Sequence, residues 1–500
     1  MEITMQDPVQ DEDGDGDRLS SLPDRIVHRI ISFLTLKDLA RFSFTSRRCQ
    51  ELCNSTPTLS LSNIDILKPD DILCRLSINA FLHSLMLHRC SHRVKMQSLS
   101  LRWSFQHSLP DEEFRVWSWL QHAVNSGVRE FNLNITGKPF SLPVCVLGCK
   151  SLSSLVVNTN NGVLRFPSTL SLSYASSSTL RKLILEYVRM EDDGFQQWLP
   201  SFKFLKVLCL SKVSGMKSMR IASSSIEKLK IVSIESLCHI QIQEVEKLNE
   251  LYILWEFKKC GSKSLEISAP NLQRFVWAGD TVDYFSMRSS SHLWRAVIGL
   301  LPPANQSRGR EDACKANFDE LLRSIHSTKN LTLSIEFVEI LLEHGCLPFL
   351  LDNLVTLNIR RSTRITGHQV QALSSLLTGT TKLYHLIIST LRRILPNPHN
   401  SASDISHSVS AGINIDVTVI TSLEMINSMA SKQLPFKMKK ITMELPNGEN
   451  ELELIKYLLK SAEKLEEMTI SYSSPLPSYF SSELTKYKKP FTKLHLHRKP

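Results

Sequence analysis

One apolar pattern recurs through most of the chain and limits the folds that it can adopt. The pattern is L-x-x-L-x-L, in which other large apolar residues can replace Leu, and eight consecutive copies begin between Met96 and Leu272. Successive copies begin 21 to 32 residues apart. Alternate residues of each copy can turn into a shared core, but a single copy buries them only by stacking on its neighbours. The sequence therefore predicts a solenoid of short parallel strands, of the α/β class.

The spacing of the copies indicates which solenoid this is, since leucine-rich repeats have a period of about 20 to 29 residues. The Asn that follows the strand in the strict repeat is mostly absent, so we expect an irregular array with variable connecting segments. Two longer connections, residues 281–330 and 391–416, interrupt the array. The first includes a polar loop at 302–312, and a helix through Phe318, Leu321, Leu322 and Ile325 is predicted after it. Five further copies begin at these residues: Leu354, Leu383, Met438, Leu465 and Phe491.

Residues 19–60 differ from the repeats, because they predict a compact group of three helices. Pro23 suits the first position of a helix, and Asp24 places a negative charge at the positive end of the helix dipole. At 100° per residue, the apolar residues from Ile26 to Leu34 cover an arc of about 160°, whereas packing on one neighbour needs about 100°. The first helix therefore has an apolar flank to spare.

Two more helices are predicted directly after the first. Thr35 with Asp38 indicates an N-cap with an acidic partner, and Cys49, Leu52 and Cys53 form one buried stripe of a third helix. A unit of about 40 residues is at the lower limit of independent folding. The spare flank of its first helix is therefore expected to dock on another protein, as an amphipathic helix docks in a groove.

The segments LPDRIVHRIISFL and TLKDLARFSFTSRRCQELC resemble the F-box, the module that attaches substrate adaptors to the Skp-type linker of cullin-based ubiquitin ligases. The resemblance departs at Cys49 and Cys53, where many plant members have Trp. It implies a Skp-type linker and, through it, a cullin as partners. The positions that the resemblance places against the linker are Leu22, Pro23, Ile26, Ile30, Ile31, Leu34 and Leu39.

Later segments resemble the same family. The stretches FRVWSWLQHAVNSGVREFNLNI and APNLQRFVWAGD are similar to the leucine-rich repeats of plant F-box proteins, and LPFKMKKITMELPNGENELELIKYLLKSAEKLEEMTI resembles the FBD domain that ends many of them. The predicted organisation is a disordered acidic leader at 1–17, an F-box at 18–60, a connecting helix within 61–93, the repeat solenoid at 94–430, the FBD domain at 431–475 and a basic tail with a possible last strand at 476–500.

Composition narrows the cellular setting that we expect. Eleven cysteines without paired C-x-x-C spacing, behind an acidic N-terminus that lacks the features of a signal peptide, favour reduced thiols in the nucleus or cytoplasm. No apolar stretch is long enough to predict a membrane span. The net charge of +10 favours acidic partners. Without a recognisable nucleic-acid fold, the basic tail is interpreted as a solvated end, and we expect no nucleic-acid partner.

Candidate metal and catalytic sites are weak in this sequence. Asp11, Asp13 and Asp15 match half of an EF-hand loop, but the closing position is Leu22, so calcium binding is not expected. The pairs Cys49 with Cys53 and Cys145 with Cys149, and the group His88, Cys90 and His92, complete no four-ligand set and are interpreted as packing residues. No catalytic motif is present. We therefore expect no metal, no cofactor and no enzymatic activity.

The predicted function is a non-catalytic substrate adaptor, in which the N-terminal module binds the linker and the concave face of the repeats binds an unknown target protein. Two alternatives stay open at this point. One is a leucine-rich-repeat interaction scaffold that no longer recruits a ligase. The other is a hydrolase that uses the solenoid as a frame, which a deep pocket with convergent His, Asp and Ser or Cys would favour.

Overall fold

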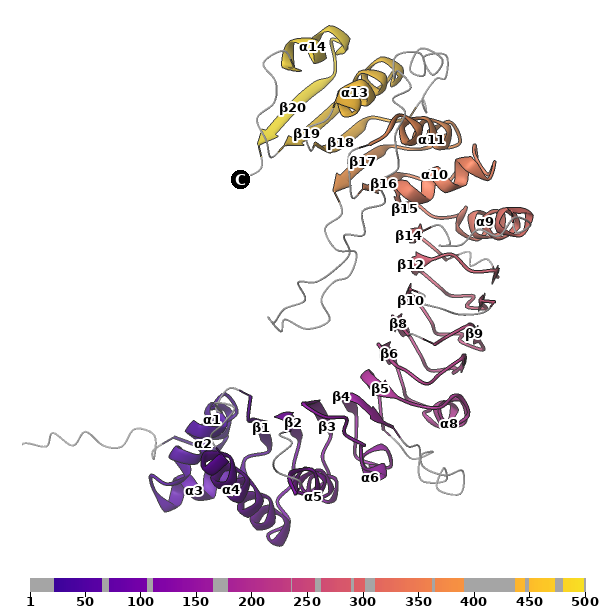
Figure 1. Ribbon diagram of the computed structural model, residues 1–500. Helices are drawn as coiled ribbons and strands as arrows, with labels where there is room; N and C mark the ends of the chain where they lie inside the picture. The colour runs from indigo at the N-terminus through magenta and orange to yellow at the C-terminus, as the bar shows by residue number, and fades with distance from the viewer. Residues whose placement is uncertain are drawn as a thin grey trace, which may run out of the picture. The chain divides into compact units, whose positions relative to one another are not determined.

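The computed structural model divides into two compact units, Met1–Leu205 and Lys206–Pro500 (Figure 1). The residues that the structure describes are 22–64, 72–105, 111–164, 179–234, 236–256, 262–288, 292–301, 311–361, 365–390, 437–445, 449–472 and 480–498.

The first unit begins with helices and continues as a parallel sheet in the order β1-β2-β3-β4-β5. Helices α4, α5 and α6 lie together on one side of these strands (Figure 1). The elements in chain order are α1 (Asp24–Ile31), α2 (Leu36–Ser43), α3 (Arg47–Ser55), β1 (Thr58–Ser62), α4 (Ile72–Ser91), β2 (Ser98–Ser104), α5 (Glu112–Asn125), β3 (Glu130–Thr136), α6 (Val144–Leu147), β4 (Ser154–Val163), β5 (Lys182–Arg189), α8 (Asp192–Trp198) and the 3₁₀ helix η2 (Leu199–Ser201).

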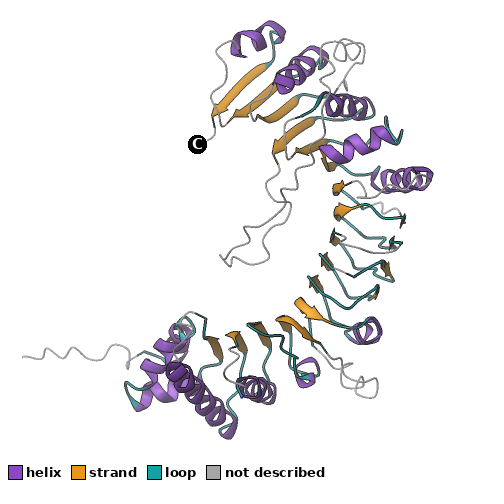
Figure 2. Ribbon diagram, in the orientation of Figure 1, coloured by secondary structure: helices purple, strands orange, loops and turns teal. Residues whose placement is uncertain are grey.

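The second unit contains two parallel sheets, one in the order β6-β8-β10-β12-β14-β15-β16-β17-β18-β19-β20 and one in the order β13-β11-β9-β7. Helices α9, α10, α11, α13 and α14 lie on one side of the longer sheet (Figure 2). The elements are β6 (Val207–Ser211), β7 (Ser218–Ala222), β8 (Lys228–Val232), β9 (His239–Gln243), β10 (Glu250–Trp255), β11 (Ser264–Ile267), β12 (Arg274–Asp280), β13 (Tyr284–Met287), β14 (Arg295–Leu301), α9 (Glu311–Ile325), β15 (Asn330–Ser334), α10 (Ile335–Glu343), β16 (Thr356–Arg361), α11 (Gly367–Thr378), β17 (His385–Thr390), β18 (Lys440–Leu445), α13 (Glu449–Ser461), β19 (Glu467–Tyr472), α14 (Phe480–Tyr487) and β20 (Lys493–Arg498).

The repeated apolar pattern explains how the strands pair. Phe131 of β3 lies opposite Leu155 of β4, and Leu133 lies opposite Val157, so equivalent positions of successive copies are in register. All four side chains are at most 1% exposed. Because side chains alternate along a strand, the residues between them face away from this core. The predicted fold class, N-terminal helices followed by a long parallel sheet of solenoid type, is confirmed.

The sequence pattern did not reveal the second sheet. Copies between β6 and β13 are short, and their return segments form strands β7, β9, β11 and β13, with buried pairs such as Met219 with Ile221 and Ile240 with Ile242. Strand β9 lies on the side of the main sheet where α9 lies in later repeats (Figure 1). A repeat of 21 to 25 residues leaves little room for a helix, so an extended return segment closes the core.

Other elements extend or confirm the sequence-based prediction. Strands β1, β14 and β15 also belong to the array and were missed. The predicted helix through Phe318 and Ile325 is confirmed as α9. Strand, helix and strand are present as β18, α13 and β19 within the predicted FBD segment, and α14 precedes the predicted last strand, β20. Three predictions concern segments outside the described residues: the leader at 1–17, most of the loop at 302–312, and the connection at 391–416.

Among the described helices, none combines the length and the apolar character that crossing a membrane requires.

Gly279 shows how closely the strands approach. Its φ is +110°, and a Cβ added there would lie 2.1 Å from the carbonyl oxygen of Trp255, which is its register partner on β10. We predict that Gly279→Ala lowers the free energy of unfolding by about 2–4 kcal/mol, because the new methyl group adds both backbone strain and overpacking. Urea denaturation would measure the loss.

Gly367 is the matched control, because a Cβ at this first residue of α11 meets nothing within 4 Å. Gly367→Ala should leave stability within about 0.5 kcal/mol of the parent chain. Equal effects of the two substitutions would contradict the close contact at Gly279.

Candidate functional site

The three N-terminal helices begin at residues whose side chains or carbonyl groups complete them. Helix α1 begins at Asp24, with Pro23 as its N-cap, so Pro23 lies one residue before the helical position that the sequence predicted. The Pro23 carbonyl accepts hydrogen bonds from the N–H groups of Ile26 and Val27, at 2.9 and 3.2 Å. Arg48 of α3 donates to the Leu22 carbonyl at 3.0 Å and to Asp24 at 3.3 Å. The start of α1 is therefore tied to α3.

Helices α2 and α3 form as the sequence predicts. The Thr35 hydroxyl oxygen accepts the N–H of Asp38 at 3.3 Å and donates its proton to the Asp38 carboxylate at 2.7 Å. Cys49, Leu52 and Cys53 are the buried residues of α3. Burial, reinforced by the nearby Cys49, raises the pKa of the Cys53 thiol to about 12. Cys53 therefore serves as an apolar packing residue at neutral pH.

The structure divides the predicted linker-facing residues into two groups. Ile26 is 48% exposed, Ile30 is 41% exposed and Pro23 is also exposed, whereas Leu22 and Leu34 are half-buried. Ile31 and Leu39 are only 3% and 2% exposed. These two side chains are already covered by their own chain, and the contact of the seven residues with a linker stays a prediction.

The division follows from the angular positions on α1. At about 100° per residue, Phe33, Ile26 and Ile30 lie within about 60° of each other, and Val27 and Ile31 occupy the other part of the apolar arc. That other part packs toward α3, since α1 and α3 are in contact. Phe33 is 79% exposed. Ile26, Ile30 and Phe33 form an uncovered surface, which we call the α1 apolar face.

A second aromatic ring is exposed where α2 ends. Phe44 is 81% exposed and lies 6.4 Å, between ring centroids, from Phe81 of α4. Sequence periodicity did not identify Phe44 as a candidate contact residue, because Phe44 lies outside the periodic apolar stripe of α2. Its exposure adds apolar area to the helical unit beyond the residues that were predicted.

The helical unit is joined to the first repeats by one buried cation. Arg89 of α4 is 1% exposed, and its guanidinium donates to the carbonyl groups of Asn54 and Thr56, both at 2.7 Å. Burial lowers the pKa of Arg89 to about 10, so the guanidinium is protonated at neutral pH. The bonds satisfy carbonyl groups at the C-terminal end of α3, which has no intrahelical donors for them.

A buried ion pair then joins α4 to α5. Arg75 donates to the carboxylate of Glu112 at 2.5 and 2.8 Å, and Asn79 donates to the same carboxylate at 3.3 Å. Arg75 also donates to the carbonyl of Ser104 at the end of β2. Removal of one partner of such a pair is costly, because the other charge is left buried.

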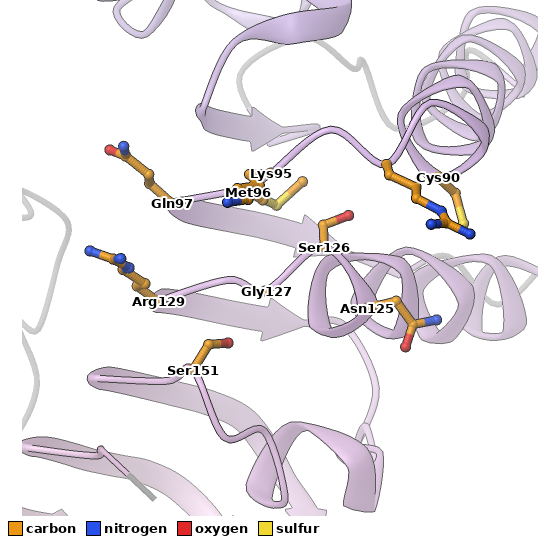
Figure 3. A pocket seen from close by; sticks show the side chains of 10 residues that line it. Cys90, Lys95, Met96, Gln97, Asn125, Ser126, Gly127, Arg129 and Ser151 are labelled. Atoms are coloured by element: carbon orange, nitrogen blue, oxygen red, sulfur yellow. The ribbon is translucent and has the colours of Figure 1, made fainter.

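A pocket of about 700 Å³ lies where β2, β3 and β4 begin (Figure 3). Arg93, Lys95 and Arg129 give it positive charge, and Gln97 and Ser151 add polar groups. Figure 3 shows Gln97 and Arg129 directly before the neighbouring strands β2 and β3. Its lining, as the described residues form it, includes no histidine or carboxylate, so it offers no general base of the kind expected for a hydrolase.

The described residues also contain a group of cation-ligand type that the sequence analysis missed. Glu339 and Glu343 of α10 and His368 of α11 place one ligand atom each within 4.8 Å of the others. Glu339 is already bonded to His368 Nδ1 at 2.9 Å and to the Gln369 amide at 3.0 Å. Glu343 and His368 are exposed, so the arrangement is that of a surface hydrogen-bonded pair beside a second carboxylate.

Comparison with known proteins identifies the helical unit and the array. Residues 19–60 match the F-box domain, and residues 116–290 match the repeats described as "FBD-associated F-box protein At5g56370, LRR repeats". The putative F-box/FBD/LRR-repeat protein At4g03220 of Arabidopsis thaliana is 27% identical over 376 residues, which are 72% of this chain and 71% of that protein. The chain is similar to plant F-box/FBD/LRR-repeat proteins, with an F-box at its matched N-terminal helices and leucine-rich repeats after it.

Other relatives of the family extend over most of the chain. F-box protein At3g59150 of Arabidopsis thaliana is 26% identical over 387 residues, covering 75% of this chain and 76% of its own length. F-box/LRR-repeat protein At3g59200 of the same species is 24% identical over 479 residues, covering 92% of this chain and 82% of its own. The helical unit with the α1 apolar face is thus the part of the chain that matches the F-box domain.

Arg89 gives a prediction about how firmly the F-box is attached. Arg89→Met keeps an apolar stem but leaves the Asn54 and Thr56 carbonyl groups without donors. We expect the free energy of unfolding of the first unit to fall by about 2–4 kcal/mol, with faster proteolytic cleavage between α3 and β1. Urea denaturation and limited proteolysis would measure both effects.

Arg25 is the control, because it lies exposed on α1. Arg25→Met should change stability by less than about 0.5 kcal/mol. If both variants unfold and are cleaved as the parent chain is, the anchoring role of Arg89 is refuted.

Proposed function

We propose that this F-box protein is the substrate-recognition adaptor of a cullin-based ubiquitin ligase of the SCF type. The F-box binds a Skp-type linker, and the repeats bind a target protein for ubiquitination. The observation that carries this proposal is the α1 apolar face. Ile26 and Ile30 on α1, and Phe33 just after its end, leave much of their surface exposed within the described chain, whereas Val27 and Ile31 of the same helix are buried.

The size of this face supports a docking role. Full burial of one Ile or Phe side chain against a partner contributes about 1.5–3 kcal/mol. Ile26, Ile30 and Phe33 are each between 41% and 79% exposed, so a partner groove can still remove much of their surface from water. Single exposed apolar residues are common on protein surfaces. Ile26 and Ile30 instead form an i, i+4 pair with Phe33 on the same face, which is the anchor pattern of a helix that binds in a groove.

The mechanism of such an adaptor is proximity. A linker bound at the F-box and a target bound at the repeats are held in one complex, which raises the local concentration of the acceptor lysine near the ubiquitin-transfer enzyme. The adaptor therefore needs no nucleophile or general base of its own.

Several finer assignments accompany this proposal. We assign residues 18–60 to the F-box, 94–430 to the solenoid and 431–475 to the FBD domain, and we propose action in the nucleus or cytoplasm without a cofactor. Leu22, Pro23 and Leu34 stay in the proposed linker contact, at the margin of the α1 apolar face. Ile31 and Leu39 act instead by holding α1 and α2 in place.

The proposal predicts the effect of charge on the α1 apolar face. In a pull-down of a purified Skp-type linker by the full chain, Ile30→Asp should weaken capture at least about tenfold, because a carboxylate would be buried against the partner. The double variant Ile26→Asp with Ile30→Asp should abolish detectable capture. Titration by calorimetry would give the affinities.

Ile64 provides a matched control, since it is 40% exposed and lies outside the F-box helices. Ile64→Asp should capture the linker as the parent chain does. A parent chain that captures no linker would support the alternative of a repeat scaffold without ligase recruitment. Equal capture by all variants would place the linker contact elsewhere.

A further inference from the structure

The exposed face of the main sheet in the second unit carries three arginines on nearby strands. Arg274 begins β12, Arg295 begins β14, and Arg360 lies near the end of β16. Arg274 and Arg295 are register partners on adjacent strands, so their side chains leave the sheet side by side. We call these three residues the arginine face.

Arg274 and Arg295 share one row across the sheet, and Arg360 lies two strands from Arg295 and four residues further along its own strand. The Arg274 guanidinium carbon lies 5.3 Å from the centre of the Tyr252 ring on β10. Burial raises the pKa of the Tyr252 phenol, and the positive charges of Arg274 and Arg295 oppose that rise. Burial lowers the pKa of the Arg360 guanidinium, and the charge of Arg295 lowers it further. Arg295 therefore lies within electrostatic range of both the Tyr252 phenol and Arg360.

None of the three arginines forms an ion pair within the described part of the chain. Arg274 Nε is buried and has no hydrogen-bond partner. Glu250 is the register partner of Arg274 on β10, and it forms an ion pair with Lys228 at 2.9 Å. Asp280, at the far end of β12, has an interaction of its own.

Some basic residues along this edge of the sheet have a carboxylate partner. Lys206 pairs with Glu227 at 2.8 Å, and Lys440 pairs with Glu467 at 3.1 Å. Arg274 and Arg295 have no such partner among the described residues, and they are adjacent to each other. Like charges on adjacent strands repel each other, so an anion bound between them would relieve that repulsion.

The surroundings of the arginine face suit a protein ligand. Val276 and Val297 are register partners that form an apolar floor beside the arginines. Trp294, which directly precedes Arg295, is 45% exposed at the edge of the sheet, and Tyr252 lies half-buried beside Arg274. Arg, Trp and Tyr are the residue types enriched where binding energy concentrates at protein interfaces.

We propose that the arginine face binds a phosphorylated segment of the target protein, with Arg274 and Arg295 as the phosphate ligands and Arg360 as a third positive charge. The proposal rests on the proposed function, in which the repeats hold the target. Two adjacent guanidinium groups can bind the same anionic group of a ligand. A phosphate suits them better than a carboxylate, because it carries a charge of about −1.5 to −2 and three acceptor oxygens, whereas a carboxylate carries one charge. The planar fork of arginine binds phosphate through two parallel hydrogen bonds.

The test uses the full chain in complex with a Skp-type linker and three fluorescent peptide pools of random sequence. The pools differ only at one fixed central residue, which is phosphoserine, serine or glutamate. We expect fluorescence anisotropy to detect binding of the phosphoserine pool, and binding of the serine pool to be at least about tenfold weaker, with the glutamate pool closer to serine.

The variant Arg274→Gln with Arg295→Gln should weaken binding of the phosphoserine pool at least about tenfold. Arg360→Gln alone should weaken it less. Arg220→Gln is the matched control, because Arg220 is an exposed strand arginine on the other sheet of the same unit. It should bind the pool within about twofold of the parent chain. Linker capture and the thermal melt should be the same for all variants, which shows that they are folded.

The outcomes separate this inference from the proposed function. A chain that captures the linker but binds the phosphoserine and serine pools equally, or binds neither, overturns the arginine face as a phosphate site. Equal binding by the Arg274 and Arg295 double variant and by the Arg220 control overturns it as well. Complete competition by random duplex DNA would assign the surface to nucleic acid instead. A chain that captures no linker refutes the ligase role, whatever the peptides do.

Discussion

A short strand with two inward-facing apolar residues is stable only when the next strand covers them, and the rest of this structure depends on that constraint. Leu251 of β10 lies opposite Leu229 of β8 on one side and Phe275 of β12 on the other. All three are fully buried. The register that brings these residues together also fixes the neighbours of every side chain on the opposite face. Core packing thereby determines the layout of the surface that is free to bind a partner.

The repeated pattern was sufficient to predict most strands of the main sheet, but it left open what closes each repeat on the other side. Apolar pairs such as Ile240 with Ile242 are too short to stand out from the pattern around them. The burial of Arg89 could not be predicted for a different reason, because an arginine near the end of a helix is expected to be solvated. Its burial depends on the carbonyl groups of Asn54 and Thr56, which belong to a different element.

The F-box illustrates the same limit at a finer scale. Helical periodicity correctly placed Ile26 and Ile31 on one broad apolar arc, but only the position of α3 decides that Ile31 is covered and Ile26 is not. Phe44 lies outside the periodic stripe and could not be selected at all. On the sheet, Arg274, Arg295 and Arg360 are spread over three repeats, so their grouping depends on strand pairing and could not be recognised from local sequence.

The buried guanidinium of Arg89 restricts the movement of the F-box within the first unit. Its two bonds fasten the last turn of α3 to α4, and Arg75 with Glu112 fastens α4 to α5 in turn. The F-box therefore cannot swivel freely on the first repeats. Within this unit the F-box has a defined orientation relative to the early strands. A protein bound to α1 would therefore have a defined orientation relative to these strands as well, which a flexible linker would not provide.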